Sequence, residues 1–91
     1  MNIKDLYKLK SRFVTRKVGI EVVVVPLVNN VAHMERLYTL NETAGFLWEN
    51  LQEDSTAESL KTLLLENFEV DATIAERDVK NFLQNVDLLV K

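Results

Sequence analysis

The segment from Leu37 to Trp48 most constrains the fold, because a strand pattern changes there directly into a helix pattern. Leu40 ends an alternating run, and Asn41 is suited to cap a helix by accepting a hydrogen bond from a backbone N–H. Apolar side chains then recur at the spacing of one buried helix face, at Ala44, Leu47, Trp48 and Leu51. The chain must therefore pack a strand and a helix that follow each other without a loop.

Two further strands are predicted upstream of this junction. Gly19 separates two β-rich runs and takes a turn conformation without steric strain. Pro26 is expected to end the second ladder because it has no N–H to donate, and the Asn29-Asn30 pair marks a turn over residues 28–33. The predicted strands are Arg12–Val18, Ile20–Val25 and Met34–Leu40.

Three helices are predicted after the junction. Ser55-Thr56-Ala57-Glu58 has the form of a capping box, with Glu58 three residues after a hydroxyl cap at Ser55. Gly45 inside the first helix should cost about 1 kcal/mol relative to alanine, so the packing of Trp48 must dominate there. The predicted helices run from about Glu42 to Leu51, from the capping box to about Phe68, and from Asp71 or Thr73 to Val90.

This order of elements predicts an α+β fold, in which three helices pack on one face of a three-stranded antiparallel meander. The arrangement is winged-helix-like. Residues 1–11 are predicted to be an N-terminal lead-in or a frayed turn, and residues 12–91 to form the domain.

Length and composition exclude several classes of protein. Ninety-one residues make one domain with little room for an enclosed active site. The absence of cysteine excludes disulfides, thiol catalysis and thiolate metal sites. The longest apolar run, from Val22 to Val28, is too short to span a membrane, and the N-terminus has no apolar core of a signal peptide. We therefore expect a cytoplasmic protein without membrane contact.

Charge is unevenly distributed along the chain. Residues 1–17 carry a net charge of +5, residues 18–40 of −1 and residues 41–91 of −7, which gives −3 in all. Such a basic segment on an acidic body could attract an acidic partner, or it could be a solvated surface that keeps the protein soluble.

The search for catalytic or metal-binding groups finds no convincing set. His33 is the single histidine and falls in a polar turn, where an exposed side chain is expected. Glu42, Glu49 and Glu53 are expected to form a solvated helix face, because acid–base chemistry needs a pocket. Trp48 and Tyr38 are assigned to the core by their spacing. We expect neither an enzyme nor a metal ion or other cofactor.

Nucleic-acid binding is the alternative that a winged-helix-like fold raises. The third predicted helix contains Arg77, Lys80 and Asn81, which suit such a role, but acidic residues lie among them. Because phosphate neutralisation supplies most of the affinity for DNA, the acidic charge of residues 41–91 disfavours this function.

The third predicted strand, Met34–Leu40, would lie at a sheet edge with one row of N–H and C=O groups unpaired. It contains no proline or lysine that would blunt this edge. An extended peptide could add to it as a further strand. Alternatively, the N-terminal segment or a second copy of the chain could cover it, which would make a homodimer.

The junction also carries a resemblance to a known family. Leu40-Asn41-Glu42-Thr43-Ala44 followed by Leu47-Trp48 resembles the motif of the coenzyme PQQ synthesis protein D family, which are small peptide-recognition domains. The similarity extends over about residues 12–90 and includes Asp78-Val79, Phe82-Leu83 and Leu88-Leu89.

The resemblance implies a winged-helix-like domain that binds the leader of a ribosomally made precursor peptide. Such a domain presents the peptide to a modifying enzyme, often a radical SAM protein, in the PQQ pathway or a related one. In the family the leader adds to the third strand and lies in a groove toward the third helix. Carried onto this chain, the peptide-binding residues would be Met34, Glu35, Arg36, Leu37, Tyr38, Thr39, Val79 and Phe82.

We therefore expect a non-enzymatic chaperone for a precursor peptide. The alternatives are a winged-helix nucleic-acid-binding domain and a dimer formed through the same edge.

Overall fold

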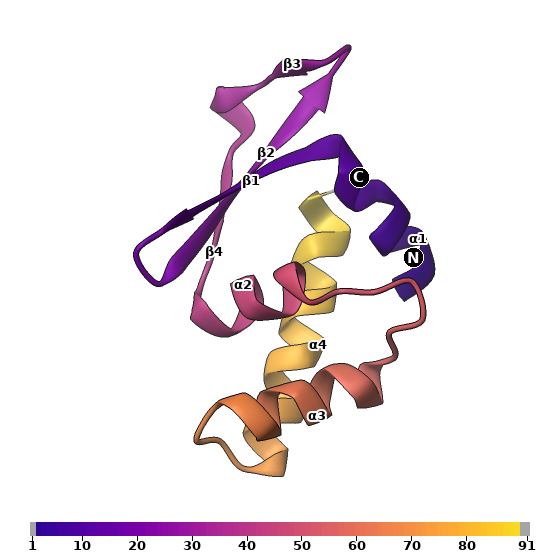
Figure 1. Cartoon of the computed structure of the whole chain (residues 1–91), viewed down its shortest axis with the longest axis vertical. Helices are drawn as coiled ribbons and strands as arrows, with labels where there is room; N and C mark the ends of the chain where they lie inside the picture. Colours follow the sequence, from indigo (N-terminus) through magenta and orange to yellow (C-terminus); the bar gives the residue numbers. More distant parts are fainter. Residues whose placement is uncertain (1, 90–91) are drawn as a thin grey trace.

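The computed structural model describes residues 2–89 and shows a four-stranded antiparallel sheet with four α-helices (Figure 1). The strands are β1 (Phe13–Val18), β2 (Glu21–Val28), β3 (Val31–Ala32) and β4 (Tyr38–Leu40). The α-helices are α1 (Ile3–Leu9), α2 (Glu42–Glu49), α3 (Ala57–Asn67) and α4 (Ala72–Leu89). Two 3₁₀ turns, η1 (Lys10–Arg12) and η2 (Met34–Arg36), complete the order α1, η1, β1, β2, β3, η2, β4, α2, α3, α4.

β2 is the central strand of the sheet. β1 pairs with one of its sides, and β3 and β4 pair one after the other with the opposite side. The β1–β2 and β2–β3 connections each have two residues, and both use left-handed backbone: Gly19 has φ +63°, and Asn29 and Asn30 have φ 52° and 63°. In the β2–β3 loop both residues have positive φ, which is the signature of a type I′ hairpin turn. In the β1–β2 loop only the first residue does, as in a type II′ turn.

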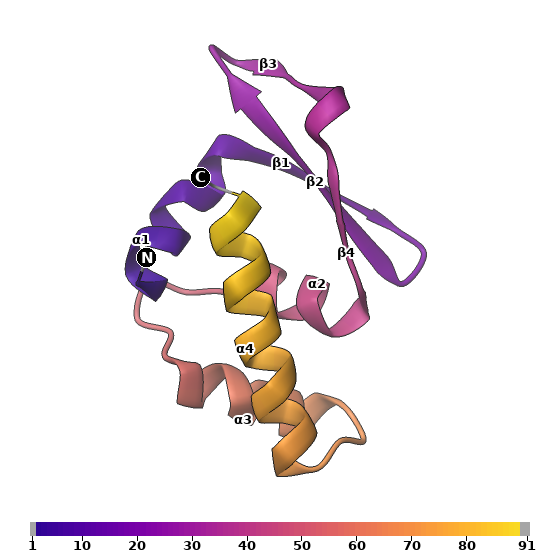
Figure 2. The same cartoon turned by 180° about the vertical axis from the view of Figure 1, so that it is seen from behind.

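The helices cover one face of the sheet, and the core lies between these two layers (Figures 1 and 2). Val22 and Val24 face the helices from β2, and α4 contributes an apolar stripe that contacts α2 and α3. The α4 stripe consists of Ala75, Val79, Phe82 and Val86. The predicted α+β class is confirmed.

The strand-to-helix junction forms as predicted. Asn41 is the N-cap of α2, and its Oδ1 accepts a hydrogen bond of 2.9 Å from the backbone N–H of Ala44. The Thr43 hydroxyl donates to the same oxygen at 3.2 Å. Leu47, Trp48 and other apolar residues of this segment are buried, so the helix face inferred from the spacing is the face that packs.

Gly45 allows α2 to approach the sheet closely. A Cβ added at this position would lie 2.6 Å from Cγ2 of Val22 on β2, which is closer than any real contact. The glycine that weakens the helix on its own is therefore required by the packing of α2 on the central strand.

Trp48 links the same helix to the edge strand β1. Its indole N–H donates a 2.9 Å hydrogen bond to the hydroxyl of Thr15. The ring of Phe13 meets the indole edge to face, with 5.7 Å between centroids. A fully buried tryptophan thus satisfies its single donor, as a buried indole requires.

Three local predictions are wrong. Residues 3–9 form α1 rather than a frayed turn, and Leu6 of this helix is buried in the core. The cap of α3 is Thr56, whose partner in the capping box is Ser59 and not Glu58. Tyr38 is 37% exposed and does not belong to the core. Residue 1 of the predicted lead-in and residues 90 and 91 of the predicted domain lie outside the described residues.

Membrane-spanning helices were sought in the described part of the chain. None of its helices combines the length and the apolar character needed to cross a bilayer.

We predict that Gly45→Ala destabilises the protein although alanine favours helix. Overpacking against Val22 costs about 1–3 kcal/mol, whereas the gain in helix propensity is about 1 kcal/mol. Urea unfolding should show a net loss that a second substitution, Val22→Ala, partly restores. Gly19→Ala is the matched control: nothing lies within 4 Å of its added Cβ, so its strain comes from positive φ and Val22→Ala should not relieve it. Equal relief of both variants would contradict the packing argument.

We also predict that Thr15→Val lowers the free energy of unfolding by about 1–3 kcal/mol, because the buried indole N–H of Trp48 loses its acceptor. Thr15→Ser keeps a hydroxyl and should remain close to the wild type in chemical denaturation. If the valine and serine variants are equally stable, the hydrogen bond does not contribute.

Candidate functional site

The edge opposite β1 is interrupted, which is the main departure from the predicted third strand. Leu27 pairs with Ala32 in β3, whereas Val24 pairs with Tyr38 in β4. In an unbroken ladder Val24 would face residue 35, so the edge contains three extra residues. These are accommodated by η2, Met34–Arg36, and the predicted strand Met34–Leu40 is therefore wrong in its first half.

Pro26 explains the interruption. It does not end β2, which continues to Val28, and it faces Phe13 of β1. Its carbonyl accepts the N–H of His33 at 3.0 Å, but it has no N–H to return to the His33 carbonyl. That carbonyl instead accepts the N–H of Arg36 at 3.0 Å, which is the hydrogen bond of the 3₁₀ turn. The missing N–H of Pro26 thus interrupts the strand that pairs with β2, whereas β2 itself continues.

The hydrogen-bond phase of β2 determines which groups of β4 are free. In a two-residue hairpin the flanking residues, here Val28 and Val31, form a hydrogen-bonded pair, and such pairs alternate along the ladder. The even-numbered residues of β2 therefore bond toward β3 and β4, so Tyr38 and Leu40 bond to Val24 and Val22. The N–H and C=O of Thr39 point away from the sheet. One complete backbone donor–acceptor pair is therefore free on β4.

Exposed apolar side chains accompany this free backbone. Ten large hydrophobic residues are exposed in the described part of the chain, and five of them fall within residues 28–38. We call this set the edge cluster; it consists of Val28, Val31, Met34, Leu37 and Tyr38. Val28 and Val31 were not predicted as site residues, although the alternation of the valine-rich hairpin could have identified them. An apolar cluster beside an unpaired strand is what an added peptide strand requires.

His33 and Glu35 form the polar part of this edge. Nδ1 of His33 lies 2.9 Å from Oε1 of Glu35, and both side chains contact solvent. The pKa of Glu35 is lowered from its ordinary value, first by a hydrogen bond from its own backbone N–H and then by the one from His33. The pair holds the start of η2 rather than forming a reactive centre. Within residues 2–89, histidine and carboxylate side chains do not gather in threes as a metal site would need.

The structure separates the predicted site residues into two groups. Met34, Glu35 and Arg36 lie on η2, Leu37 follows in extended backbone, and all four are exposed together with Tyr38 and Thr39 of β4. Val79 and Phe82, by contrast, are only 4% and 1% exposed and belong to the core. Their side chains are not open to a ligand.

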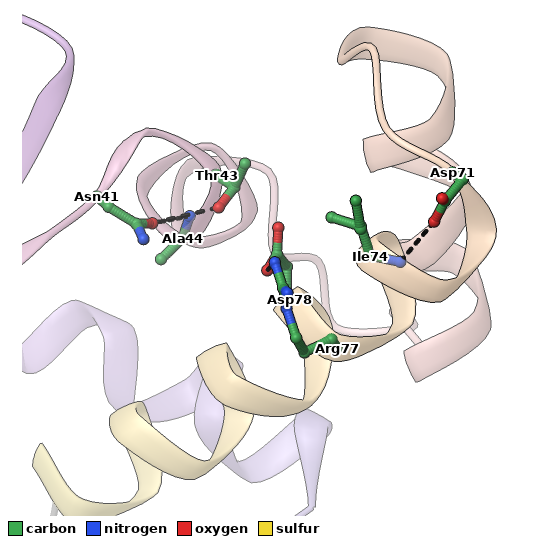
Figure 3. A network of polar contacts seen from close by, with 7 residues as sticks. All are labelled: Asn41, Thr43, Ala44, Asp71, Ile74, Arg77 and Asp78. Atoms are coloured by element: carbon green, nitrogen blue, oxygen red, sulfur yellow. Dashed lines mark hydrogen bonds and ion pairs between the residues drawn. The ribbon is translucent and has the colours of Figure 1, made fainter.

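Another side of α4 lies near the strand-to-helix junction. α4 contacts α2, and Figure 3 shows Asp78 on the side of α4 that faces the start of α2, with Arg77 beside it. The Arg77 guanidinium lies 3.4 Å from the Asp78 carboxylate and is itself 65% exposed. This part of α4 therefore presents a charged pair beside the start of α2.

The molecule also contains a cavity of about 470 Å³, but at a different place. It is lined by residues of α1, by the start of α3 and by Leu83 and Asp87 of α4. No residue of β4 lines it. A peptide that adds to a sheet edge is held by the strand's backbone and does not need this cavity.

These features define a class of protein: a small α+β domain whose sheet has an open edge with exposed apolar side chains. The sequence profile of the family described as Coenzyme PQQ synthesis protein D (PqqD) matches residues 21–87, and the chain belongs to this family. No curated protein matches the chain significantly. Among solved structures, "TbiB1 in Complex with the TbiA(beta) Leader Peptide" is similar, with a TM-score of 0.63 and 22% identity over 84% of this chain and 83% of that one. At this identity the likeness supports the fold.

We predict that native-state hydrogen exchange separates neighbouring amides of β4. The N–H groups of Tyr38 and Leu40 bond to β2 and should exchange slowly, whereas that of Thr39 should exchange at nearly the rate of an unstructured peptide. NMR exchange at a protein concentration low enough to avoid association measures all three. Equal protection of Thr39 would show that the edge is covered, for instance by a second copy.

Proposed function

We propose that this protein is a non-enzymatic peptide-binding chaperone, which binds the leader of a ribosomally synthesised precursor peptide and presents it to a modifying enzyme. The leader adds to β4 as a further strand. The modifying enzyme, a radical SAM protein or another type, supplies the chemistry, and the pathway is that of PQQ or of a related modified peptide. The protein itself needs no cofactor in this role and acts in the cytoplasm.

The observation that carries this proposal is the outward-facing N–H and C=O of Thr39 beside the exposed side chains of Leu37 and Tyr38. Membership of the PqqD family and the fold shared with a leader-bound protein support the same role. A strand that offers free backbone groups binds many sequences, so selectivity has to come from its side chains. The edge cluster supplies apolar contacts for alternate residues of the leader.

The proposed binding residues follow from exposure. They comprise the exposed segment from Met34 to Thr39, with Val31 of β3 added to it. Val79 and Phe82 act instead as the support of the site, because they fix α4 against the core. The hydrogen-bonded pair of His33 and Glu35 holds η2, which sets where Met34 projects.

We predict that Thr39→Pro abolishes leader binding with little loss of stability. Proline removes the outward N–H, and it is tolerated at an edge position whose N–H makes no ladder bond. Isothermal titration with the leader of a precursor encoded beside this gene should give no measurable binding, and urea unfolding should stay within about 1 kcal/mol of the wild type.

Thr39→Val is the matched control, because it removes the hydroxyl but keeps the backbone N–H, and it should bind the leader like the wild type. Tyr38→Pro serves as the opposite control: it removes a donor of the β2–β4 ladder and should destabilise the protein by about 3 kcal/mol. Unchanged affinity in Thr39→Pro would contradict strand addition at β4.

A further inference from the structure

The sheet has a second free edge, β1, which is longer than β4. β1 has six residues, all of them paired with β2, and in the described chain no strand pairs with its other side. The residues from Val14 to Val18 are all exposed. The leader site leaves this edge unused, since β1 and β4 lie on opposite sides of β2.

The hydrogen-bond phase of β1 follows from its own hairpin. Val18 and Glu21 flank a two-residue turn and form a hydrogen-bonded pair. Because such pairs alternate along the ladder, Arg16 and Val23 form the next one. The residues of β1 that alternate with these hydrogen-bonded positions therefore direct their N–H and C=O away from β2. These residues are Phe13, Thr15 and Lys17. The N–H of Phe13 already donates to the carbonyl of Lys10. Two complete donor–acceptor pairs, those of Thr15 and Lys17, and the carbonyl of Phe13 are therefore free on β1, compared with one pair on β4.

The side chains around this edge are basic. Arg12, Arg16 and Lys17 are exposed and, within residues 2–89, form no ion pair with a carboxylate; Lys8 in α1 is in the same state. Between Asp5 and Glu21 the sequence contains no acidic residue. Lys10 is different, because its Nζ donates to the Glu49 carbonyl at 3.4 Å and burial lowers its pKa.

Exposed apolar side chains lie among these charges. Val14, Val18 and Ile20 are 45%, 55% and 67% exposed. Val14 and Val18 alternate with Arg16 on the face of β1 opposite the core, because Thr15 reaches the core side and bonds Trp48. An occupant of this edge would meet positive charge and apolar surface in alternation.

We propose that β1 binds an acidic extended segment of a partner protein by strand addition. The backbone pairs of Thr15 and Lys17 and the carbonyl of Phe13 provide the main-chain hydrogen bonds. The basic side chains on and beside β1 attract carboxylates, and Val14, Val18 and Ile20 contact apolar residues of the added strand. A second copy of this chain does not fit through the same edge, because two β1 strands would bring like charges together.

This inference goes beyond the proposed function and does not depend on it. A leader peptide on β4 and an acidic strand on β1 would extend the sheet at its two edges without competing for the same backbone groups. One small domain could then hold two chains at the same time.

A titration with synthetic peptides tests the proposal. The probe is a capped octapeptide that alternates glutamate and valine, and the comparison peptides are a lysine–valine octapeptide and a glutamate–valine octapeptide N-methylated at alternate residues. The glutamate–valine probe should shift the NMR amide signals of Phe13, Thr15 and Lys17 and slow the hydrogen exchange of Thr15 and Lys17. Binding should weaken as salt is added, because the attracting charges are exposed.

Charge-reversal variants test the role of the basic side chains. Arg12→Glu combined with Arg16→Glu should weaken binding of the probe about tenfold or more. The matched control is Arg77→Glu combined with Lys80→Glu, which changes the net charge equally but lies on α4, away from β1. Thr39→Pro should bind the probe like the wild type. A failure of the proposed leader site on β4 can then be distinguished from a failure of the proposed acidic-strand site on β1.

Several results would overturn the proposal. These are no binding of the probe to the wild-type protein, equal binding of the lysine–valine peptide, shifts at Thr39 instead of β1, and an equal loss of affinity in the control variant. Unchanged binding of the N-methylated peptide would show attraction between charges without strand pairing, and would also overturn it.

Discussion

The alternation of hydrogen bonds along β2 is the constraint on which the rest of the sheet depends. Every other strand pairs with β2 and none pairs with another, so its odd-numbered residues bond to β1 and its even-numbered residues to β3 and β4. Pro26 has an even number, and its missing N–H is therefore absent on the side of β3. The same alternation places Pro26 at a non-hydrogen-bonded position opposite β1, where it removes nothing. One proline thus interrupts one edge and leaves the other intact.

The helical layer holds this sheet in place through two contacts of α2. Gly45 brings the helix onto Val22 of the central strand, and Trp48 bonds the hydroxyl of Thr15 on β1. Because Asn41 caps α2 directly after β4, the same helix also fixes the end of the opposite edge strand. A single two-turn helix therefore sets the relative positions of β1, β2 and β4. The edges can stay open because the domain is stabilised by the packing of the helices on one face of the sheet and not by a further strand.

Local signals were sufficient where one residue determines the structure. The cap at Asn41, the buried face around Trp48 and the last helix could be predicted because each depends on neighbours in sequence. The 3₁₀ turn at Met34–Arg36 could not, since its cause is the direction in which Pro26 lacks a donor, and this depends on the register of both hairpins. α1 has seven residues, too few to be stable alone, and its formation depends on burial of Leu6. The position of Val79 could not be predicted either. An apolar stripe in the sequence does not show whether its residues pack in the core or line a binding groove.

The two edges of the sheet differ in the way that two different ligands would require. β4 offers one free backbone pair at Thr39 within an apolar surface, so the side chains of its ligand must provide most of the selectivity. β1 offers two complete free backbone pairs and one further carbonyl among unpaired basic residues, so it selects by charge and accepts a longer segment. Lysine and arginine on an edge strand are also a common protection against aggregation, and here the protection and the selection have the same physical origin. The positive charge of β1 repels the β1 edge of a second copy but attracts an acidic strand. β1 can therefore select an acidic strand without a pocket.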